Sequence, residues 1–245
     1  MYYSQIISII FLIPFTLFLH NTLAIEEPLY QICSSTSKNF TFDTPYQNNL
    51  NKLLAFLQYK TPPTGFSLTS IGKNPSKVYG LSLCRGDVNA SDCNACVLDA
   101  SAEIRKRCPY NKGANIWYDN CMLKYSNQDF FGKIDLENRF CLCNVQNISN
   151  NPSLFNKKVK ELLSKLAGQS ASSRKHYAAS EMKLDMFTDL YGLAQCTRDL
   201  SSKDCKVCLD EAISKLPSCC GDKQGGRLVG GSCNVRYEIY PFVNS

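Results

Sequence analysis

Histidine is nearly absent from this chain of 245 residues, which contains only His20 and His176. Imidazole is the commonest general base in enzymes and a frequent zinc ligand, so these sites lack their usual side chain. His176 lies in the polar segment SSRKHYAAS, where we expect a solvated loop residue. A glycosidase stays open because paired carboxylates cannot be located from sequence, but no motif supports one. We therefore expect no enzyme, no cofactor and no bound metal.

Apolar runs of membrane length are also missing after the first segment of the chain. The stretch from Ile6 to Leu19 is too short to span a bilayer comfortably, and Ala24, with Thr22 two residues earlier, provides a small-residue cleavage site. We interpret residues 1–24 as a secretory signal peptide in preference to an uncleaved anchor, although no Lys or Arg precedes the apolar stretch. We expect a secreted, extracellular protein without a membrane anchor.

The net charge of +6 is modest and spread along the chain. The segment KKVKELLSKL, which begins at Lys157, is more typical of the solvated face of a helix than of a nucleic-acid patch. We therefore expect no nucleic-acid partner. The positive charge instead favours acidic wall polysaccharides or microbial surfaces.

Cysteine is the residue in excess: the chain has fourteen, and all of them follow Ala24. In an oxidising compartment an even count at this density indicates a disulfide framework, whereas in the cytosol the C-x-x-C pairs would indicate metal binding or thiol exchange. An all-cysteine zinc site and a redox switch are the alternatives, but nothing in the sequence shows an activated thiolate. We expect all fourteen cysteines to form structural disulfides.

The cysteines belong to an internal repeat. A shift of 112 residues places CRGDVNASDCNAC, which begins at Cys84, on CTRDLSSKDCKVC, which begins at Cys196, and also places YGLSLC on YGLAQC. The first cysteines of the copies meet at a shift of 110, so the second copy has two extra residues before its YGL. We predict two tandem domains of the usual size for small domains, residues 25–136 and 137–245.

Both copies have the same expected order of elements. DTPYQNNLNKLLAFLQYKTPP places four leucines on one helical face, with Asp43 or Thr44 as the N-cap. The YGL strand follows, and then a second helix that we expect to start at Ser91 or Asp92. GANIWYDNCMLKYS and GGRLVGGSCNVRYEIYPF predict pairs of strands joined by turns with Gly or Asn. Each domain is therefore predicted to be α+β, with two helices on one face of an antiparallel sheet.

The C-x-x-C geometry limits the disulfides of each copy. On the first turn of a helix, Cys93 and Cys96 project from one face and are poorly placed to bond each other. The simplest solution pairs the six cysteines of the first copy as Cys84–Cys93, Cys96–Cys121 and Cys33–Cys108. Six cysteines permit fifteen connectivities, so spacing alone does not choose among them.

The chain resembles the plant cysteine-rich repeat secretory proteins, which are built from ginkbilobin-type domains. The resemblance rests on two C-x8-C-x2-C units in register, the YGL-x-x-C lead-in and the tail CCGDKQGGRLVGGSCNVRYEIYPF, and it covers nearly the whole mature chain. It implies two tandem small disulfide-rich domains, each a five-stranded antiparallel sheet with two helices, and a defence-related, antifungal-like role in the apoplast. The same modules form the outer parts of cysteine-rich receptor-like kinases and plasmodesmata-located proteins, which need a transmembrane segment.

The family's disulfide pattern can be carried onto both copies. It implies the six pairs Cys33–Cys108, Cys84–Cys93, Cys96–Cys121, Cys143–Cys220, Cys196–Cys205 and Cys208–Cys233. Cys141 and Cys219 remain, each adjacent or nearly so to a bonded cysteine. We expect a seventh disulfide between them.

The resemblance also implies a carbohydrate site. The founding member binds mannose through an asparagine directly after the first cysteine, an arginine seven residues after the fifth and a glutamate five residues after the sixth. The second copy matches at all three places, with Asn144, Arg227 and Glu238. The first copy matches at none, since its residues there are Ser34, Asn115 and Ser126. We expect any inherited site for mannose or a mannan-type glycan in the second domain.

These three residue types suit a sugar, because vicinal hydroxyls both donate and accept hydrogen bonds. A two-residue turn at 230–231 would place Arg227 opposite Asn234 and leave Glu238 roughly 13 Å farther along the strand, so either the turn lies elsewhere or the arginine reaches along the sheet. In the alternative, Arg227 and Glu238 form an ordinary ion pair and Asn144 is a turn residue. We expect Arg227 to be an exposed strand residue whose replacement costs little stability.

Three sequons predict N-linked glycans at Asn39, Asn89 and Asn147, the last only three residues from Asn144. The sequence thus favours a glycosylated, lectin-like recognition protein that binds a mannose-type glycan through its second domain. The alternative is an interaction or structural module that binds no sugar and partners cell-surface receptor ectodomains or wall components.

Overall fold

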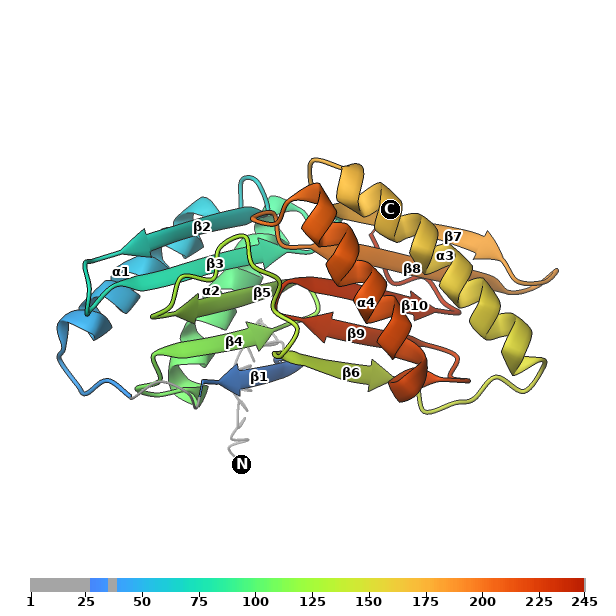
Figure 1. The fold of residues 1–245 in the computed structure, drawn as a ribbon, viewed down its shortest axis with the longest axis horizontal. Coiled ribbons are helices and arrows are strands. Elements are labelled where there is room, and N and C mark those ends of the chain that lie inside the picture. The colour runs from blue at the N-terminus through green and yellow to red at the C-terminus, as the bar shows by residue number, and fades with distance from the viewer. Residues whose placement is uncertain (1–26, 35–38, 245) are drawn as a thin grey trace, which may run out of the picture.

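The computed structural model describes residues 27–34 and 39–244, which form two domains of the same architecture (Figure 1). Each domain is a five-stranded antiparallel sheet with two helices packed on one face. The predicted α+β fold class is therefore confirmed. The predicted signal peptide, residues 1–24, lies outside the described residues.

The strands of the first domain lie in the order β1-β4-β5-β3-β2. Every neighbouring pair is antiparallel, and the three inner strands are largely buried. The elements are β1 (Tyr30–Cys33), α1 (Pro45–Lys60), β2 (Phe66–Ile71), β3 (Val78–Cys84), α2 (Ala90–Arg107), β4 (Gly113–Trp117) and β5 (Cys121–Ser126).

The second domain repeats this topology in the order β6-β9-β10-β8-β7. Its elements are β6 (Arg139–Cys143), α3 (Pro152–Ser172), β7 (Tyr177–Lys183), β8 (Asp189–Cys196), α4 (Ser202–Cys220), β9 (Gly226–Gly230) and β10 (Cys233–Glu238). In Figure 1, α3 and α4 lie in front of their sheet, whereas α1 and α2 lie behind theirs.

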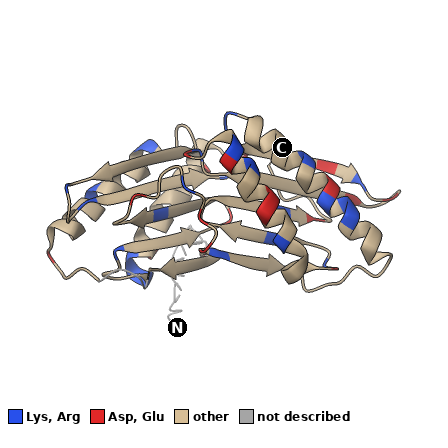
Figure 2. Cartoon of the chain, viewed as in Figure 1, with Lys and Arg blue, Asp and Glu red and all other residues tan. Residues whose placement is uncertain are grey.

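The first helix of each domain begins in the same way, with a polar N-cap residue followed by proline. The side chain of Thr44 accepts a hydrogen bond from the backbone of Gln47, and that of Asn151 accepts one from Leu154. Proline suits the next position because its missing N–H would have no partner there. Apolar residues at helical spacing are buried in both helices, whereas Lys157, Lys160 and Lys165 of α3 are exposed; Figure 2 marks the basic residues along this helix. The expected solvated basic face in this segment is therefore present.

The second helix of the first domain starts earlier than predicted. We expected Ser91 or Asp92 at its start, but α2 begins at Ala90 because Asn89 is the N-cap. The Asn89 side chain accepts a hydrogen bond of 2.9 Å from the N–H of Asp92. An asparagine at this position satisfies one of the amides that have no partner within the helix.

Seven disulfides connect all fourteen cysteines, in the pairs expected from the sequence. Cys93 and Cys96 both lie on the buried face of α2 and bond different strands. The seventh bond, Cys141–Cys219, joins β6 to the end of α4 and is particular to the second domain. The pairs are Cys33–Cys108, Cys84–Cys93, Cys96–Cys121, Cys141–Cys219, Cys143–Cys220, Cys196–Cys205 and Cys208–Cys233.

The two domains pack through the ends of their sheets. The indole N–H of Trp117 donates a hydrogen bond of 3.1 Å to the carbonyl of Gly230, and its ring lies 5.3 Å from that of Phe140. The amide of Gln195 donates to the carbonyl of Cys84. The buried apolar core of this interface is Leu81, Leu83, Trp117, Met122 and Val229.

Candidate functional site

Asn144, Arg227 and Glu238 line one pocket of about 210 Å³ in the second domain. They come from three places: the residue after β6, the middle of β9 and the end of β10. The flanking Leu228 and Tyr237 point into the core beneath α3 and α4, so this pocket lies on the opposite, helix-free face of the sheet. The structure therefore brings together the three residues selected from the sequence.

The register of the last hairpin explains how they meet. Its turn is formed by Gly231 and Ser232, one residue later than predicted. Arg227 consequently lies opposite Arg236. The pairing with Asn234, which a turn at 230–231 would give, is not formed. Glu238 is two residues beyond Arg236, roughly 7 Å along the strand. Of the two possibilities left open by the sequence, the displaced turn is the correct one.

Arg227 is not the exposed residue that we expected, since only 6% of it is accessible. Its Nη1 atom lies 2.7 Å from a carboxylate oxygen of Asp119, and its Nε donates to the side chain of Asn234. Burial lowers the pKa of Arg227 to about 10, while Asp119 opposes this effect, so the guanidinium stays charged at neutral pH. Its replacement should therefore destabilise the protein, because it would break a buried ion pair.

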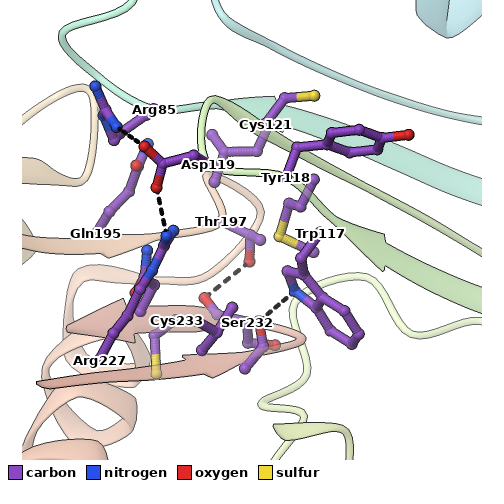
Figure 3. A pocket seen from close by; sticks show the side chains of 15 residues that line it. Arg85, Trp117, Tyr118, Asp119, Cys121, Gln195, Thr197, Arg227, Ser232 and Cys233 are labelled. Carbon is purple, nitrogen blue, oxygen red and sulfur yellow. Dashed lines mark hydrogen bonds and ion pairs between the residues drawn. The ribbon is translucent and has the colours of Figure 1, made fainter. Parts of the chain in front are cut away.

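Asp119 is the functional residue that the sequence did not reveal. It lies in the turn between β4 and β5 of the first domain, yet its carboxylate accepts hydrogen bonds from Arg227 and Arg236 of the second. It also accepts one from Arg85, and Figure 3 shows it between Arg85 and Arg227. The repeat gave no signal for it, because the same shift places it on Gly231, which has no side chain.

The Asp119–Arg227 pair also lines a second cavity at the domain junction (Figure 3). This cavity measures about 40 Å³, which suits a few water molecules and not a sugar ring. Arg85 is fixed on its other side by both carboxylate oxygens of Asp87, at 2.7 and 2.9 Å. These contacts make the junction a network of alternating charges shared by both domains.

Glu238 pairs with Arg236 at 3.1 Å, so the predicted ion pair with Arg227 was wrong in its partner. Its Oε2 atom is buried and makes no hydrogen bond of normal geometry with any described residue. Burial raises the pKa of Glu238, although Arg236 and the hydroxyl of Tyr240 oppose the rise. A side chain at Gly225 would collide with this oxygen, because a Cβ there would lie 1.7 Å away.

Asn144 adopts the turn geometry of the alternative interpretation. Its Oδ1 accepts a hydrogen bond of 2.9 Å from the N–H of Gln146. Its own N–H donates to the carbonyl of Gly225, which extends the ladder between β6 and β9. The side-chain NH₂ forms no hydrogen bond within the described part of the chain and can still donate to a ligand.

The first domain has a cavity at the corresponding place, with different chemistry. It measures about 590 Å³ and is lined by Ser34, Asn115 and Ser126, the residues that fail to match the carbohydrate pattern. Lys124, the counterpart of Arg236, forms a buried ion pair with Asp135 there. The two copies therefore keep the position of the pocket and change its polar groups.

The remaining candidate residues lie away from this pocket or at its edge. Asn39, Asn89 and Asn147 are all exposed. His176 is half-buried before β7, and its pKa is lowered by burial and by Arg198, so the expected fully solvated loop residue was wrong. Among residues 27–34 and 39–244, no cluster of three metal-ligating side chains occurs, and no helix has the length and apolar character to cross a membrane.

Comparisons with known proteins agree with this architecture. A family model described as salt stress response/antifungal matches residues 32–128 and 140–240. The chain is 54% identical to an antimicrobial ginkbilobin-2-like protein of Castanea crenata, over 99% of each chain. It is 51% identical to cysteine-rich repeat secretory protein 38 of Arabidopsis thaliana, over 89% of this chain and 86% of that one.

Solved structures give the same result. The tandem DUF26 ectodomain of the cysteine-rich receptor-like protein PDLP8 from Arabidopsis thaliana superimposes with a TM-score of 0.77 at 31% identity. The match covers 87% of this chain and 98% of that ectodomain. The corresponding ectodomain of PDLP5 superimposes with a TM-score of 0.72 at 27% identity, over 88% of this chain and the whole of that one.

Proposed function

Because the chain belongs to the salt stress response/antifungal family, with a copy of the domain in each half, we propose that it is a defence protein that recognises a mannose-type glycan through its second domain. It is a secreted protein of the tandem DUF26 type. In this proposal it acts by binding and not by catalysis. The name of the Castanea crenata relative, which calls it antimicrobial, supports the defensive role.

The observation that carries the sugar proposal is the buried Oε2 of Glu238 in the pocket, which makes no hydrogen bond of normal geometry with a described residue. A buried acceptor without a partner costs about 1–3 kcal/mol, and a ligand hydroxyl would remove that cost. The free NH₂ group of Asn144 supplies a donor in the same pocket, so one vicinal diol could use both.

Arg227 has a different role in this proposal from that implied by the resemblance. Its Nη1 and Nε atoms are already bonded to Asp119 and Asn234. It therefore acts as a positioning residue that holds the pocket wall against the first domain. The pocket is smaller than the roughly 300–1,000 Å³ of typical small-molecule sites, so it suits one sugar ring.

Mannose titration of the full secreted chain, followed by amide resonances, tests the proposal. We expect weak, saturable shifts around the pocket of the second domain, because few hydrogen bonds must first displace water. Asn144→Ala should weaken binding about threefold to tenfold, the effect of one hydrogen bond. Asn150→Ala is the control, since this exposed asparagine lies outside the pocket.

Two results would reject sugar binding. One is the lack of a saturable response at mannose concentrations on the order of tens of millimolar. The other is equal binding by Asn144→Ala and the wild-type chain. Asn144→Ala also removes the exposed bond from the N–H of Gln146 to Oδ1, but it keeps the backbone bond to Gly225, so the variant should fold normally.

A second candidate function is recognition of a cell-surface ectodomain of similar build, with no sugar involved. It is favoured by the turn between β7 and β8, where Met186 is 84% and Phe187 91% exposed. Adjacent apolar side chains at a loop tip are typical of a surface that a partner covers. Phe187→Ser should then abolish binding to purified receptor ectodomains of this family and leave any mannose response unchanged.

A further inference from the structure

An apolar cleft of about 310 Å³ opens between α3 and α4, on the helical side of the second domain and away from the polar pocket. Val159 and Leu163 of α3 form one wall, Ile213 and Leu216 of α4 form the other, and the ring of Tyr237 lies between them. This volume falls at the lower end of the range for small-molecule sites.

At the corresponding place in the first domain, a hydrogen bond between side chains joins the two helices. The repeat places Pro217 of α4 on Arg105 of α2, and the matching buried faces of α3 and α1 place Lys160 on Asn51. In the first domain the guanidinium of Arg105 donates a hydrogen bond to the side-chain oxygen of Asn51. Proline and lysine cannot form this bond, so the second cleft has no bridge across it.

The first domain also has an aromatic cluster at this end of its helices that the second domain lacks. Phe40 packs against Tyr110 with ring centroids 5.8 Å apart, and its N–H donates to the Tyr110 carbonyl at 2.8 Å. The same backbone bond in the second domain joins Ile148 to Asp222. A smaller and a charged side chain thus replace two rings, and Asp222 instead binds Asn156 at the edge of the cleft.

Two lysines give the cleft its charge. Lys157 and Lys160 line it, are exposed, and form no salt bridge with a described residue, whereas Lys158 between them pairs with Glu161. Ammonium groups beside an apolar slot complement a ligand with an anionic head and an apolar chain. A neutral apolar molecule would form no ion pair with either lysine.

We propose that this cleft binds a single-chain anionic amphiphile of the fatty-carboxylate class. The chain lies between α3 and α4, where each methylene leaves water for an apolar wall. The carboxylate lies beside Lys157 and Lys160. This inference is independent of the proposed sugar site, because the two pockets lie on opposite faces of the sheet and share no residue.

Titration of the disulfide-bonded full chain with monomeric dodecanoate, followed by methyl resonances, tests the inference. We expect saturable shifts of the methyl groups of Leu163, Ile213 and Leu216. The methyl groups of Leu54 and Ile104, the counterparts of Leu163 and Leu216 in the first domain, should not respond. Dodecanol should bind about threefold to tenfold more weakly, the effect of losing two exposed ion pairs.

A matched variant transplants the bridge of the first domain into the second. Lys160→Asn combined with Pro217→Arg should reduce dodecanoate binding at least tenfold, whereas Lys165→Asn, on the same helix outside the cleft, should leave it unchanged. If the double variant does not fold, Lys157→Asn with Lys160→Asn leaves the core intact and should reduce dodecanoate affinity to that of dodecanol.

Three results would overturn the inference. The first is the lack of a saturable methyl response to monomeric dodecanoate, and the second is an equal response in both domains. The third is binding to phosphatidylserine vesicles without any response to monomeric dodecanoate, which would assign the lysines to a membrane surface instead.

Discussion

Lys124 of the first domain and Arg236 of the second occupy the same position in the repeat, but the acids that neutralise them come from different places. Lys124 is held by Asp135, which follows its own domain's last strand. Arg236 is held by Glu238 of its own strand and by Asp119 of the other domain. A cation on a buried sheet face needs a partner, and here the neighbouring domain supplied one. The pocket of the second domain therefore depends on the first.

The helical faces of the two domains differ as well. The Arg105–Asn51 hydrogen bond joins the helices of the first domain, whereas the second has Lys160 and Pro217 at these positions, beside an apolar cleft. Matching disulfides hold the helices and strands of both domains in the same arrangement, so the side chains on the helical face can differ without changing the fold. Several substitutions test this comparison between the domains, beginning with the disulfides.

The largest expected difference concerns the long-range disulfides. Cys33–Cys108 links residues 75 positions apart, and no second disulfide of the first domain closes this loop. Its removal should lower the free energy of unfolding of the first domain by about 4 kcal/mol. Removing Cys143–Cys220 should cost the second domain only about 1 kcal/mol, because Cys141–Cys219 closes nearly the same loop.

Denaturant unfolding of the paired Cys→Ser variants measures both changes. Equal losses in the two domains would show that the seventh disulfide does not substitute for its neighbour. The Cys141→Ser, Cys219→Ser variant provides the control, and it should also lose about 1 kcal/mol.

The next largest effect is expected from Asp119→Ala. This change leaves Arg227 and Arg236 without their shared carboxylate, and we expect a loss of about 3 kcal/mol. This value is at the lower end for buried pairs, because the Asp119 side chain is 34% exposed to water. Although the substitution lies in the first domain, hydrogen exchange should increase in β9 and β10 of the second.

Asp210→Ala is the control for that experiment. It breaks the exposed Lys206–Asp210 pair on α4, which contributes at most about 0.5 kcal/mol. Increased exchange confined to the first domain after Asp119→Ala would contradict the dependence of the second domain's pocket on its neighbour.

The smallest expected effect is an opposite response to acid of two carboxyl groups, one in each domain. The pKa of Asp135 is raised by burial but lowered more by Lys124, so it falls below its usual 3.8. Its contribution to stability is then complete above pH 3.8 and is lost as the pH falls through the lowered pKa. The pKa of Glu238 is instead raised above 4.5 by burial, so this group should add stability to the second domain as the pH falls toward 4.5.

Hydrogen exchange measured for each domain across this pH range checks the signs. Asp135→Asn should reduce the loss in the first domain, where the pKa values of Asp87 and Glu103 are also lowered, and Glu238→Gln should remove the contribution that opposes Asp185 in the second. An unchanged acid response in either variant would contradict the assignment of that carboxyl group.

Much of the fold could be predicted because its signals repeat within the chain. The Cys84 and Cys196 units show the same spacing, and a helix carrying Cys93 and Cys96 cannot join them to each other. The three candidate residues of the pocket came from the resemblance to the family's mannose site, and the repeat assigned them to the second domain because only that copy has all three. The helix start at Ala90 was missed by one residue, since a polar cap can lie at any of several adjacent polar positions.

The sequence by itself determined the repeated cysteine spacing and the two α+β domains, because cysteine spacing and apolar periodicity are properties of neighbouring residues, and the family resemblance supplied the disulfide pairs. Only the tertiary structure decided that Arg227 is buried and that Asp119 holds it, since 108 residues separate the two and Asp119 has no acidic counterpart in the other copy. Only the packing of α3 against α4 likewise revealed the cleft between them. Its walls come from two helices that are distant in sequence, and so do the two side chains, Arg105 and Asn51, that join the helices of the first domain.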